Sequence, residues 1–260
     1  MKTSLRKLIT LGLMLWYFSV GSSALAIPVL QVGAPGGSGE GVYADYIATL
    51  TNPSEDDTAV TTGNTLYVGG VYKSGVDLLG GKFGSGSDWS GVGLPTAFNG
   101  HGAILLATVA NNSLGSGTLT VNGNAAFATS MTNSYFPNNH APTNGADYLF
   151  FDIGNFANSS SVPNFADETG GENGEIKSLT IAISGYDWVH FDVMALETDM
   201  ETKTTNKVTT TTYDTDLENN PGSHDVTWKK PPTSVPEPST LLLLCSGLVG
   251  LGFFGRRKKA

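Results

Sequence analysis

The sequence predicts an all-β fold, either a β-sandwich or a jelly-roll-like domain. Glycine is abundant, with 33 residues in a chain of 260, and Thr, Asn and Ser separate short apolar runs. Several of these runs alternate apolar and polar residues, which is typical of strands with one buried face. Many short strands joined by long polar loops favour two packed sheets over a helical protein.

Individual segments support this prediction to different degrees. Residues 117–123 alternate cleanly, which places Leu119 and Val121 on the buried face. Residues 103–110 are continuously apolar and fit either a buried strand or a short helix. Residues 64–72 are rich in β-formers but carry central glycines, so we expect a bulge or bend there.

The clearest predicted hairpin lies between residues 175 and 195. Apolar residues alternate along both halves, and residues 184–187 supply the turn. The inward face consists of Leu179, Ile181, Ile183, Val189, Phe191 and Val193. The opposite face of the second strand carries Trp188, His190, Asp192 and Met194. This second face is expected to meet solvent.

The chain changes character beyond residue 200. Residues 202–215 are rich in threonine and predict either an exposed edge strand or a disordered linker. Residues 231–238 have the proline content of an extended linker. We therefore divide the chain into a β-domain at 27–200 and an edge segment with linker at 201–234, between two terminal segments.

Charge and cysteine content exclude several functions. Between residues 27 and 255 the chain carries all 23 acids but only seven of its 14 basic residues. Such an acidic surface repels nucleic acid and anionic lipid headgroups, so no nucleic-acid partner is expected. The single cysteine, Cys245, lies in the C-terminal apolar run. The domain therefore has no disulfide, no thiol nucleophile and no cysteine-ligated zinc.

Residues 1–26 have the organisation of a secretory signal peptide. A basic start precedes the apolar stretch 8–18, and small residues follow it. A permanent N-terminal anchor or a buried helix is the alternative, and the shortness of the run disfavours it. The basic residues are Lys2, Arg6 and Lys7, and the cleavage-site residues are Ala24 and Ala26. The expected partners are the Sec translocon and signal peptidase.

Residues 235–260 form a second targeting segment. A proline-rich lead-in precedes an apolar run at 240–254, which predicts a transmembrane helix of roughly 22 Å. That is short for a hydrocarbon core of about 30 Å and favours a transient anchor. The basic residues that follow favour a cytoplasmic C-terminus. They are Arg256, Arg257, Lys258 and Lys259.

The tripeptide Pro236, Glu237 and Pro238, followed by the apolar run and the basic tail, resembles the PEP-CTERM sorting signal of Gram-negative bacteria. The resemblance implies recognition and processing by an exosortase, a membrane-embedded transpeptidase. It also implies transient attachment to the inner membrane, followed by a final location at the cell surface or in the exopolysaccharide and biofilm matrix. It covers residues 235–260 and depends on all of its parts occurring together.

Three further segments are similar to the choice-of-anchor proteins. They are the start of the mature chain at 27–33, the strand region at 186–192, and residues 220–226 ahead of the tail. Members of that family join an uncharacterised exported domain to alternative C-terminal sorting tags. The resemblance implies no known activity.

His190 and Asp192 are the first candidate site. An imidazole two residues from a carboxylate on one strand face is suited to a metal site or to acid–base chemistry. The expected arrangement is nevertheless a solvent-facing polar cluster. Residues 167–175 form an acidic, glycine-rich loop with the oxygen ligands that Ca²⁺ requires, although a solvated loop explains the composition as well. Its acids are Asp167, Glu168, Glu172 and Glu175.

Residues 214–218 are a second, weaker calcium candidate, and no other cofactor is expected. Trp89 and Trp188 are candidate platforms for sugar rings of an exopolysaccharide. The pairs Asp147 with Asp152 and Asp187 with Asp192 are the carboxylates that a polysaccharide-acting enzyme would use. No nucleophile elbow or phosphate loop is present. We therefore predict a non-enzymatic surface or matrix protein, with a carbohydrate-binding module, calcium-dependent or not, as the alternative.

Overall fold

The computed structural model describes residues 26–36, 41–51, 53, 55–84, 88–131, 146–232, 246 and 248. The predicted signal helix and the predicted sorting helix fall almost wholly outside these residues. Among the residues described, no helix has the length and apolarity needed to span a membrane. All strands belong to the first of two units, Met1–Lys229, so the fold is that of this unit alone.

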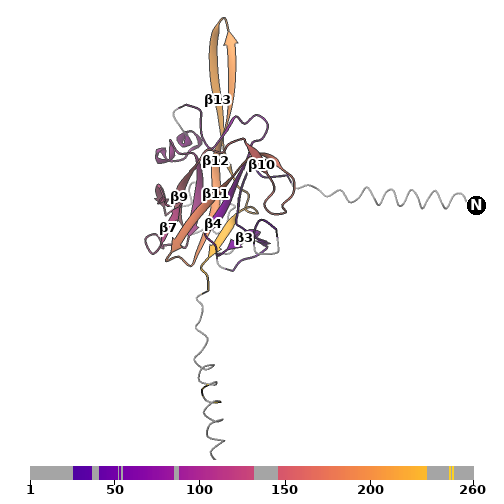
Figure 1. Cartoon of the computed structure of the whole chain (residues 1–260). Helices are drawn as coiled ribbons and strands as arrows, with labels where there is room; N and C mark the ends of the chain where they lie inside the picture. The colour runs from indigo at the N-terminus through magenta and orange to yellow at the C-terminus, as the bar shows by residue number, and fades with distance from the viewer. Residues whose placement is uncertain are drawn as a thin grey trace, which may run out of the picture. The chain divides into compact units, whose positions relative to one another are not determined.

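The first sheet has five strands, all paired antiparallel (Figure 1). Its order is β1-β4-β11-β10, with β7 pairing on β11. These strands are β1 (Leu30–Gly33), β4 (Thr65–Val71), β7 (Thr118–Val121), β10 (Ser160–Val162) and β11 (Glu172–Ser184). Leu119 and Val121 of β7 are buried, which confirms the face predicted for that strand.

The second sheet has nine strands in the order β2-β3-β14-β12-β6-β9-β8, with β5 and β13 also pairing on β12. The pairing of β3 with β14 is parallel and the others are antiparallel. The strands are β2 (Tyr46–Ile47), β3 (Thr58–Thr61), β5 (Leu78–Leu79), β6 (Ala103–Val109), β8 (Ala128–Ser130), β9 (Asp147–Gly154), β12 (Trp188–Thr205), β13 (Val208–Asn219) and β14 (Val226–Lys229).

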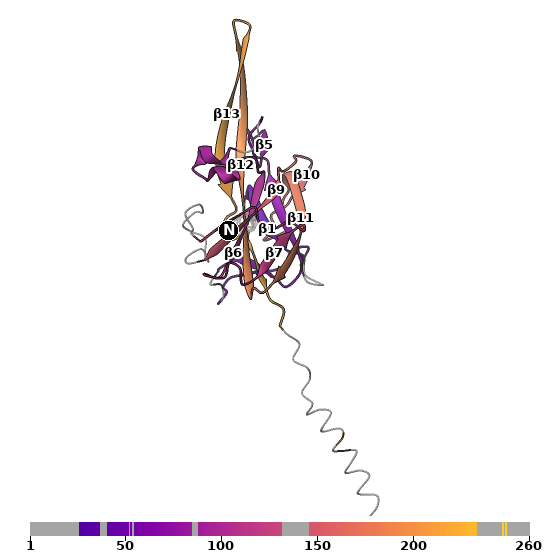
Figure 2. The ribbon, with the colours of Figure 1, turned by 90° about the vertical axis from the view of Figure 1, so that its left-hand side faces the viewer.

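The main core lies between the two sheets (Figure 2). Each sheet turns one apolar face inward, as the alternation of its strands requires. The first sheet contributes Leu66, Val68, Leu179 and Ile181, and the second contributes Leu105, Phe151, Val189, Phe191 and Val193. The prediction of an all-β fold is thereby confirmed, and the two facing sheets make it a sandwich.

The predicted hairpin at 175–195 is wrong in its pairing, although both strands and the turn exist. β11 pairs with β4, β7 and β10, whereas β12 pairs with β5, β6, β13 and β14. The turn after Ser184 therefore carries the chain from one sheet to the other. Ile181 and Phe191 belong to the same core and meet it from opposite sheets. Alternation shows which face of each strand is apolar, but it does not show which strand pairs with it. The same pattern therefore fits a hairpin within one sheet and a connection between two facing sheets.

The glycines of β4 do not form the predicted bulge. Gly69 and Gly70 keep a regular register with both neighbouring strands. A Cβ on Gly70 would lie 2.5 Å from the ring of Phe156, and one on Gly69 would lie 2.9 Å from the ring of Phe165. Glycine is therefore required at both positions, because the ring of Phe156 packs against Gly70 and the ring of Phe165 packs against Gly69. Residues 103–109, left open between strand and helix, form the buried strand β6.

The outer face of the nine-stranded sheet carries a second layer. The 3₁₀ helices η1 (Trp89–Val92) and η2 (Thr96–Phe98) bring Trp89 and Phe98 into a separate buried cluster. Their partners from the sheet are Ile104, Leu106, Tyr148, Phe150, Met194 and Leu196. Both faces of β6 are buried in consequence, which explains why its sequence is continuously apolar rather than alternating.

β12 and β13 continue beyond the sandwich as a projecting hairpin (Figure 1). Its two-residue turn is Asn206 and Lys207, at φ 53° and 66°, as a type I′ turn requires. The threonine-rich region 202–215, predicted as an exposed edge strand or a disordered linker, therefore forms the outer part of this exposed hairpin, with the end of β12, the turn and most of β13. The predicted boundary at residue 200 falls inside β12, and the fold continues to Lys229 because β14 lies between β3 and β12.

Candidate functional site

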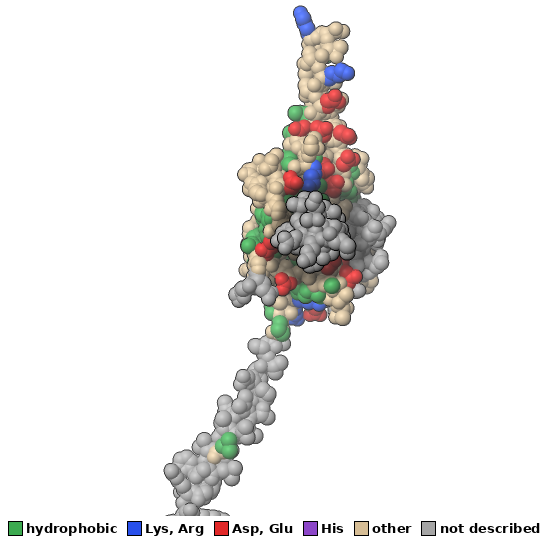
Figure 3. Space-filling model, turned by 90° about the vertical axis from the view of Figure 1, so that its right-hand side faces the viewer, with side chains coloured by type: hydrophobic (Ala, Val, Ile, Leu, Met, Phe, Trp, Pro, Cys, Tyr) green, Lys and Arg blue, Asp and Glu red, His purple; other side chains and the backbone are tan. Residues whose placement is uncertain are grey.

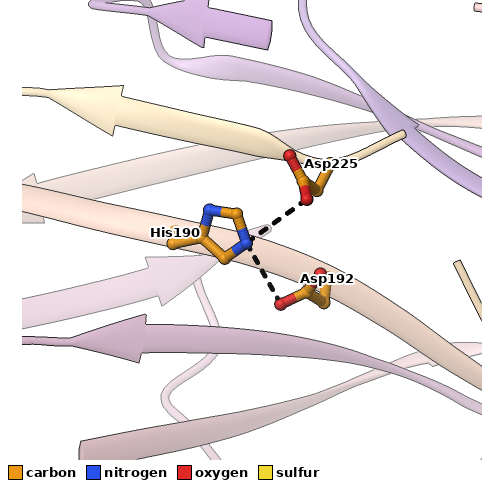
Figure 4. Close-up of side chains that lie close together, drawn as sticks. All are labelled: His190, Asp192 and Asp225. Atoms are coloured by element: carbon orange, nitrogen blue, oxygen red, sulfur yellow. Dashed lines mark ion pairs between the residues drawn. The ribbon is translucent and has the colours of Figure 1, made fainter. Parts of the chain in front are cut away.

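The candidate site lies on the outer face of the nine-stranded sheet, where β12 and β14 pair (Figure 4). Inward-facing Val189, Phe191 and Val193 alternate with His190 and Asp192, which therefore point to the outer face. Asp225 immediately precedes β14, whose Val226 lies opposite Phe191. The strand pairing thus brings Asp225 beside the two polar side chains of β12.

The three side chains surround one point in the interior. The Nε2 atom of His190 is 3.3 Å from Asp192 Oδ2 and 3.6 Å from Asp225 Oδ2. His190, Asp192 and Asp225 are each 0% exposed. One nitrogen and two oxygens of these residues lie within 4.8 Å of one another, and no other trio of potential metal ligands does so among the residues that the structure describes.

Neighbouring polar groups fix the orientation of two of these side chains. The Nδ1 atom of His190 lies 2.9 Å from the hydroxyl of Thr227 on β14, which lies 3.4 Å from the hydroxyl of Thr58 on β3. Asn220 donates from Nδ2 to Asp192 Oδ1 at 3.1 Å and accepts from the backbone N–H of Val193. The imidazole is therefore held with Nε2 directed at the carboxylates.

Burial and charge act against each other at His190. Burial alone lowers the pKa of the imidazole, but the adjacent charges of Asp192 and Asp225 outweigh it and raise the pKa to about 9. Burial raises the pKa of Asp225 well above its usual range; Asp192 raises it further and His190 opposes the shift. Near neutral pH the metal-free cluster therefore holds a charged imidazole, and Asp225 tends to keep its proton.

Glu55 adds a third acid to this region. It lies three residues ahead of β3 and is only 7% exposed. Its charge adds a small contribution to the raised pKa of both His190 and Asp225. The surroundings are thus rich in carboxylates for a fully buried site, and they favour a positively charged occupant.

This arrangement supports two chemical roles. A buried imidazolium that is paired with the ionised Asp192 and lies beside the carboxyl group of Asp225 links β12 to the segment ahead of β14. The same three groups, with the imidazole neutral and both carboxylates ionised, present donor atoms of the types that bind divalent metals. Acid–base chemistry on a substrate is a poor fit, because a general acid or base must come within hydrogen-bond reach of its substrate and these side chains are fully buried.

The predicted solvent exposure of this strand face is therefore wrong. The alternation along β12 is as predicted, but the side chains on the outer face, His190, Asp192 and Met194, are buried rather than exposed to solvent. Met194 belongs to the aromatic cluster beneath η1 and η2, and Trp188 is partly buried at the start of β12. Alternation identified the inward face and could not show that the other face is also covered.

Trp89 cannot serve as the predicted sugar platform. Its side chain is 0% exposed, and its indole Nε1 donates to the backbone oxygen of His101. A stacking platform needs an open ring face, so the residue acts as the centre of the outer cluster. Trp188 is the remaining predicted platform, and it is partly covered.

The acids predicted to hold calcium are not gathered around a common point. Asp167 accepts from the backbone and hydroxyl of Thr169, and Glu168 accepts from the backbone N–H of Tyr43. Glu175 pairs with Lys177 and accepts from the backbone of Ala157, while Glu172 begins β11. The weaker candidate, residues 214–218, lies within β13.

The carboxylate pairs proposed for a glycosidase are also separated by their surroundings. Asp147 is buried and caps the backbone N–H groups of Ser113 and Leu114. Asp152, on the same strand, is exposed and pairs with His101 at 3.0 Å. Asp187 lies exposed in the turn ahead of β12, whereas Asp192 is buried. Neither pair forms an accessible acid–base couple.

The predicted targeting residues fall outside the described part of the chain, apart from Ala26, its first residue. They are Ala24, Pro236, Glu237, Pro238, Arg256, Arg257, Lys258 and Lys259. The sequence also left Asn220 and Asp225 without a chemical role, although it singled out the segment 220–226. That segment and 186–192 meet at the cluster because β14 pairs with β12, which no local pattern reveals.

Fold and tail together define an all-β protein that carries a C-terminal sorting signal. Residues 234–258 match the family model described as the PEP-CTERM protein-sorting motif. The motif implies an exported protein that an exosortase sorts, with a C-terminal membrane anchor that is cleaved. No curated protein and no solved structure is significantly similar to the chain.

Proposed function

We propose that this chain is a non-enzymatic component of the cell surface or extracellular matrix of a Gram-negative bacterium. In this role, an exosortase processes the tail after export, and the β-sandwich is the part that remains outside. The match of residues 234–258 to the sorting motif carries the proposal. The earlier resemblance of residues 27–33, 186–192 and 220–226 to choice-of-anchor proteins supports it, because those domains are joined to exchangeable sorting tags.

The structure of the domain is consistent with a displayed protein. The only close grouping of an imidazole with two carboxylates that the described residues contain is fully buried, which supports a structural rather than a catalytic role. The hairpin β12–β13 presents an exposed surface of threonines and acids away from the sandwich. Because Trp89 is fully buried, it cannot stack on a sugar ring, and carbohydrate binding is not proposed.

The proposal is tested by altering the motif in the full chain, expressed in a host that carries the sorting enzyme. Replacing Pro236, Glu237 and Pro238 together with alanine should leave an unprocessed, membrane-retained chain. The matched control replaces Pro231 and Pro232, two prolines outside the matched residues. Fractionation into membrane, surface and medium, with intact mass of the C-terminus, measures the outcome. Identical distribution and processing of the altered and unaltered chains would refute sorting through this motif.

A further inference from the structure

We propose that His190, Asp192 and Asp225 form a structural site for one divalent transition-metal ion, best matched by zinc. The site would join β12 to the segment that leads into β14, within the outer layer of the nine-stranded sheet. The proposal does not depend on the sorting role, and its test gives a result whether or not the tail is processed.

The spacing of the donor atoms is the first argument. Nitrogen and oxygen ligands about 2.0–2.2 Å from one zinc ion lie roughly 3–3.5 Å from each other. The distances from His190 Nε2 to the two carboxylates, 3.3 and 3.6 Å, match this spacing. A direct charge-assisted hydrogen bond between such groups would be shorter, at about 2.7–2.9 Å. Each carboxylate oxygen therefore lies farther from Nε2 than a direct charge-assisted hydrogen bond would place it, at a distance suited to a shared ion.

The hydrogen-bond inventory is the second argument. Neither carboxylate oxygen of Asp225 meets the geometry of a hydrogen bond, although the nearby side chain of Thr58 lowers the pKa of that carboxyl. Nε2 of His190 also lacks a hydrogen bond and has only its longer ion-pair contacts to Asp192 and Asp225. Both side chains are 0% exposed, so water does not satisfy these atoms from the surface. Buried polar atoms are almost always paired, and a buried group that lacks a partner signals an unseen ligand or a large energetic penalty. A metal ion at the shared point would satisfy all of these atoms together.

The supporting contacts are those found behind metal ligands. A metal-bound imidazole usually has its second nitrogen hydrogen-bonded, which fixes both ring orientation and tautomer. Thr227 occupies this position at Nδ1 of His190. Asn220 holds Asp192 through Oδ1 and leaves Oδ2 directed at His190. The two ligands on β12 are thus oriented from β14 and from the loop ahead of it.

The donor set selects the class of ion. Calcium and magnesium prefer oxygen ligands, whereas an imidazole with two carboxylates suits zinc and its neighbours in the first transition row. Zinc has no redox chemistry and binds such sites more tightly than manganese, the weakest binder of that row. Two ionised aspartates also balance the double positive charge of the ion. Because all three ligands are fully buried, the metal would strengthen the fold rather than act on a substrate.

The test uses the full chain purified in detergent, first without chelator and then after stripping with chelator. We expect about one zinc ion per chain in the first preparation by elemental analysis. Zinc added to the stripped protein should raise the melting temperature, and calcium at the same concentration should not. Cobalt should give the visible absorption bands of a nitrogen- and oxygen-ligated ion. Stripped wild-type protein that binds neither zinc nor cobalt would overturn the proposal and leave a metal-free ion triad.

Variants locate the site. His190→Gln and Asp225→Asn should each weaken zinc binding at least about 100-fold, and Thr227→Val should weaken it about 10- to 100-fold. The matched control is His101→Gln, which removes the imidazole of the exposed His101–Asp152 pair and should leave zinc binding unchanged. Wild-type affinity retained by both ligand variants would contradict the assignment. If a ligand variant fails to fold, the cobalt spectrum of the wild-type chain still decides whether an imidazole and carboxylates bind the metal.

Discussion

The two halves of β12 lie in two different environments. Residues 188–196 lie in the middle of the nine-stranded sheet, and residues 197–205 extend into the projecting hairpin. Apolar and polar residues alternate from Val189 to Val193, whereas every residue from 197 to 205 except Met200 is polar. In the first half the side chains on both faces are buried, whereas the second half is almost wholly exposed. Alternation in the first half therefore identifies the inward face but does not show that the opposite face is also covered.

The difference is most marked for acidic residues. Asp192, in the buried half, is held by Asn220 and faces His190. In the hairpin, acids lie directly opposite one another without such support, as Asp199 does with Asp214 and Glu197 with Asp216. Figure 3 shows acidic side chains gathered where the hairpin leaves the sandwich. Like charges opposite each other destabilise a strand pair. Water screens the exposed pair Asp199 and Asp214, and the raised pKa of the partly buried Glu197 reduces its negative charge.

The largest expected effect comes from truncating an apolar side chain in each half. Phe191→Ala should lower the free energy of unfolding by about 3–5 kcal/mol, because it leaves a cavity between the sheets. Met200→Ala, at a position 40% exposed, should cost less than about 1 kcal/mol. Denaturant unfolding monitored by tryptophan fluorescence measures both. Equal losses would show that the hairpin is as tightly packed as the sandwich.

The next largest effect comes from removing one carboxylate from each histidine pair, in chelator-treated protein. Asp192→Asn should lower the free energy of unfolding by about 3 kcal/mol, because it removes the charge that balances a buried imidazolium. Asp152→Asn removes the partner of the exposed His101 and should cost at most about 1 kcal/mol. Comparable losses from the two substitutions would mean that burial does not strengthen the dependence of His190 on its partner.

The smallest effect is a pH dependence at the base of the hairpin. Burial, followed by the charges of Glu218 and Asp216, raises the pKa of Glu197 to about 7. An acid with a raised pKa stabilises the folded state below its unfolded value, near 4.5, and this contribution is lost as the pH rises to 7. Because Glu197 is only partly buried, we expect about 1 kcal/mol.

Glu197→Gln should therefore increase stability at pH 8 and flatten the loss between pH 4.5 and 7. Glu201→Gln, farther out on the same face of the hairpin and opposite Thr212, is the matched control. Urea midpoints across this pH range provide the measurement. A parallel decrease in both variants and in the wild type would assign the pH dependence to other groups.

Sequence patterns predicted the class of fold and the inward faces of β7, β11 and β12. These are local properties, because each strand must place its apolar residues on the side of the core. Strand pairing was not predictable in the same way. The turn at 184–187 looks the same whether it joins two strands of one sheet or carries the chain to the other sheet. The second layer over Met194 depends on Trp89, which lies just over a hundred residues earlier in the chain.

The candidate site also combines residues that local patterns reveal with residues that only strand pairing brings together. His190 and Asp192 were recognisable because one strand face holds both. Asp225 was not, since its position depends on β14 pairing with β12, and it follows Asp192 by more than thirty residues. The parallel partner of β14, β3, lies still farther away in the sequence and brings Thr58 to the cluster. Pairing between strands distant in the sequence therefore assembles the site, and no single segment of the sequence identifies it.

The position of β14 has a consequence for the order of events during export. A chain that crosses a membrane from its N-terminus delivers residues 226–229 after every other strand, yet these residues occupy the interior of a sheet, between β3 and β12. Until they arrive, β12 lacks a neighbour and His190 lacks Asp225. The sorting motif begins at residue 234, shortly after this strand. Completion of the sandwich thus nearly coincides with arrival of the signal, so that a chain ready for sorting is also one that has all the strands it needs to fold.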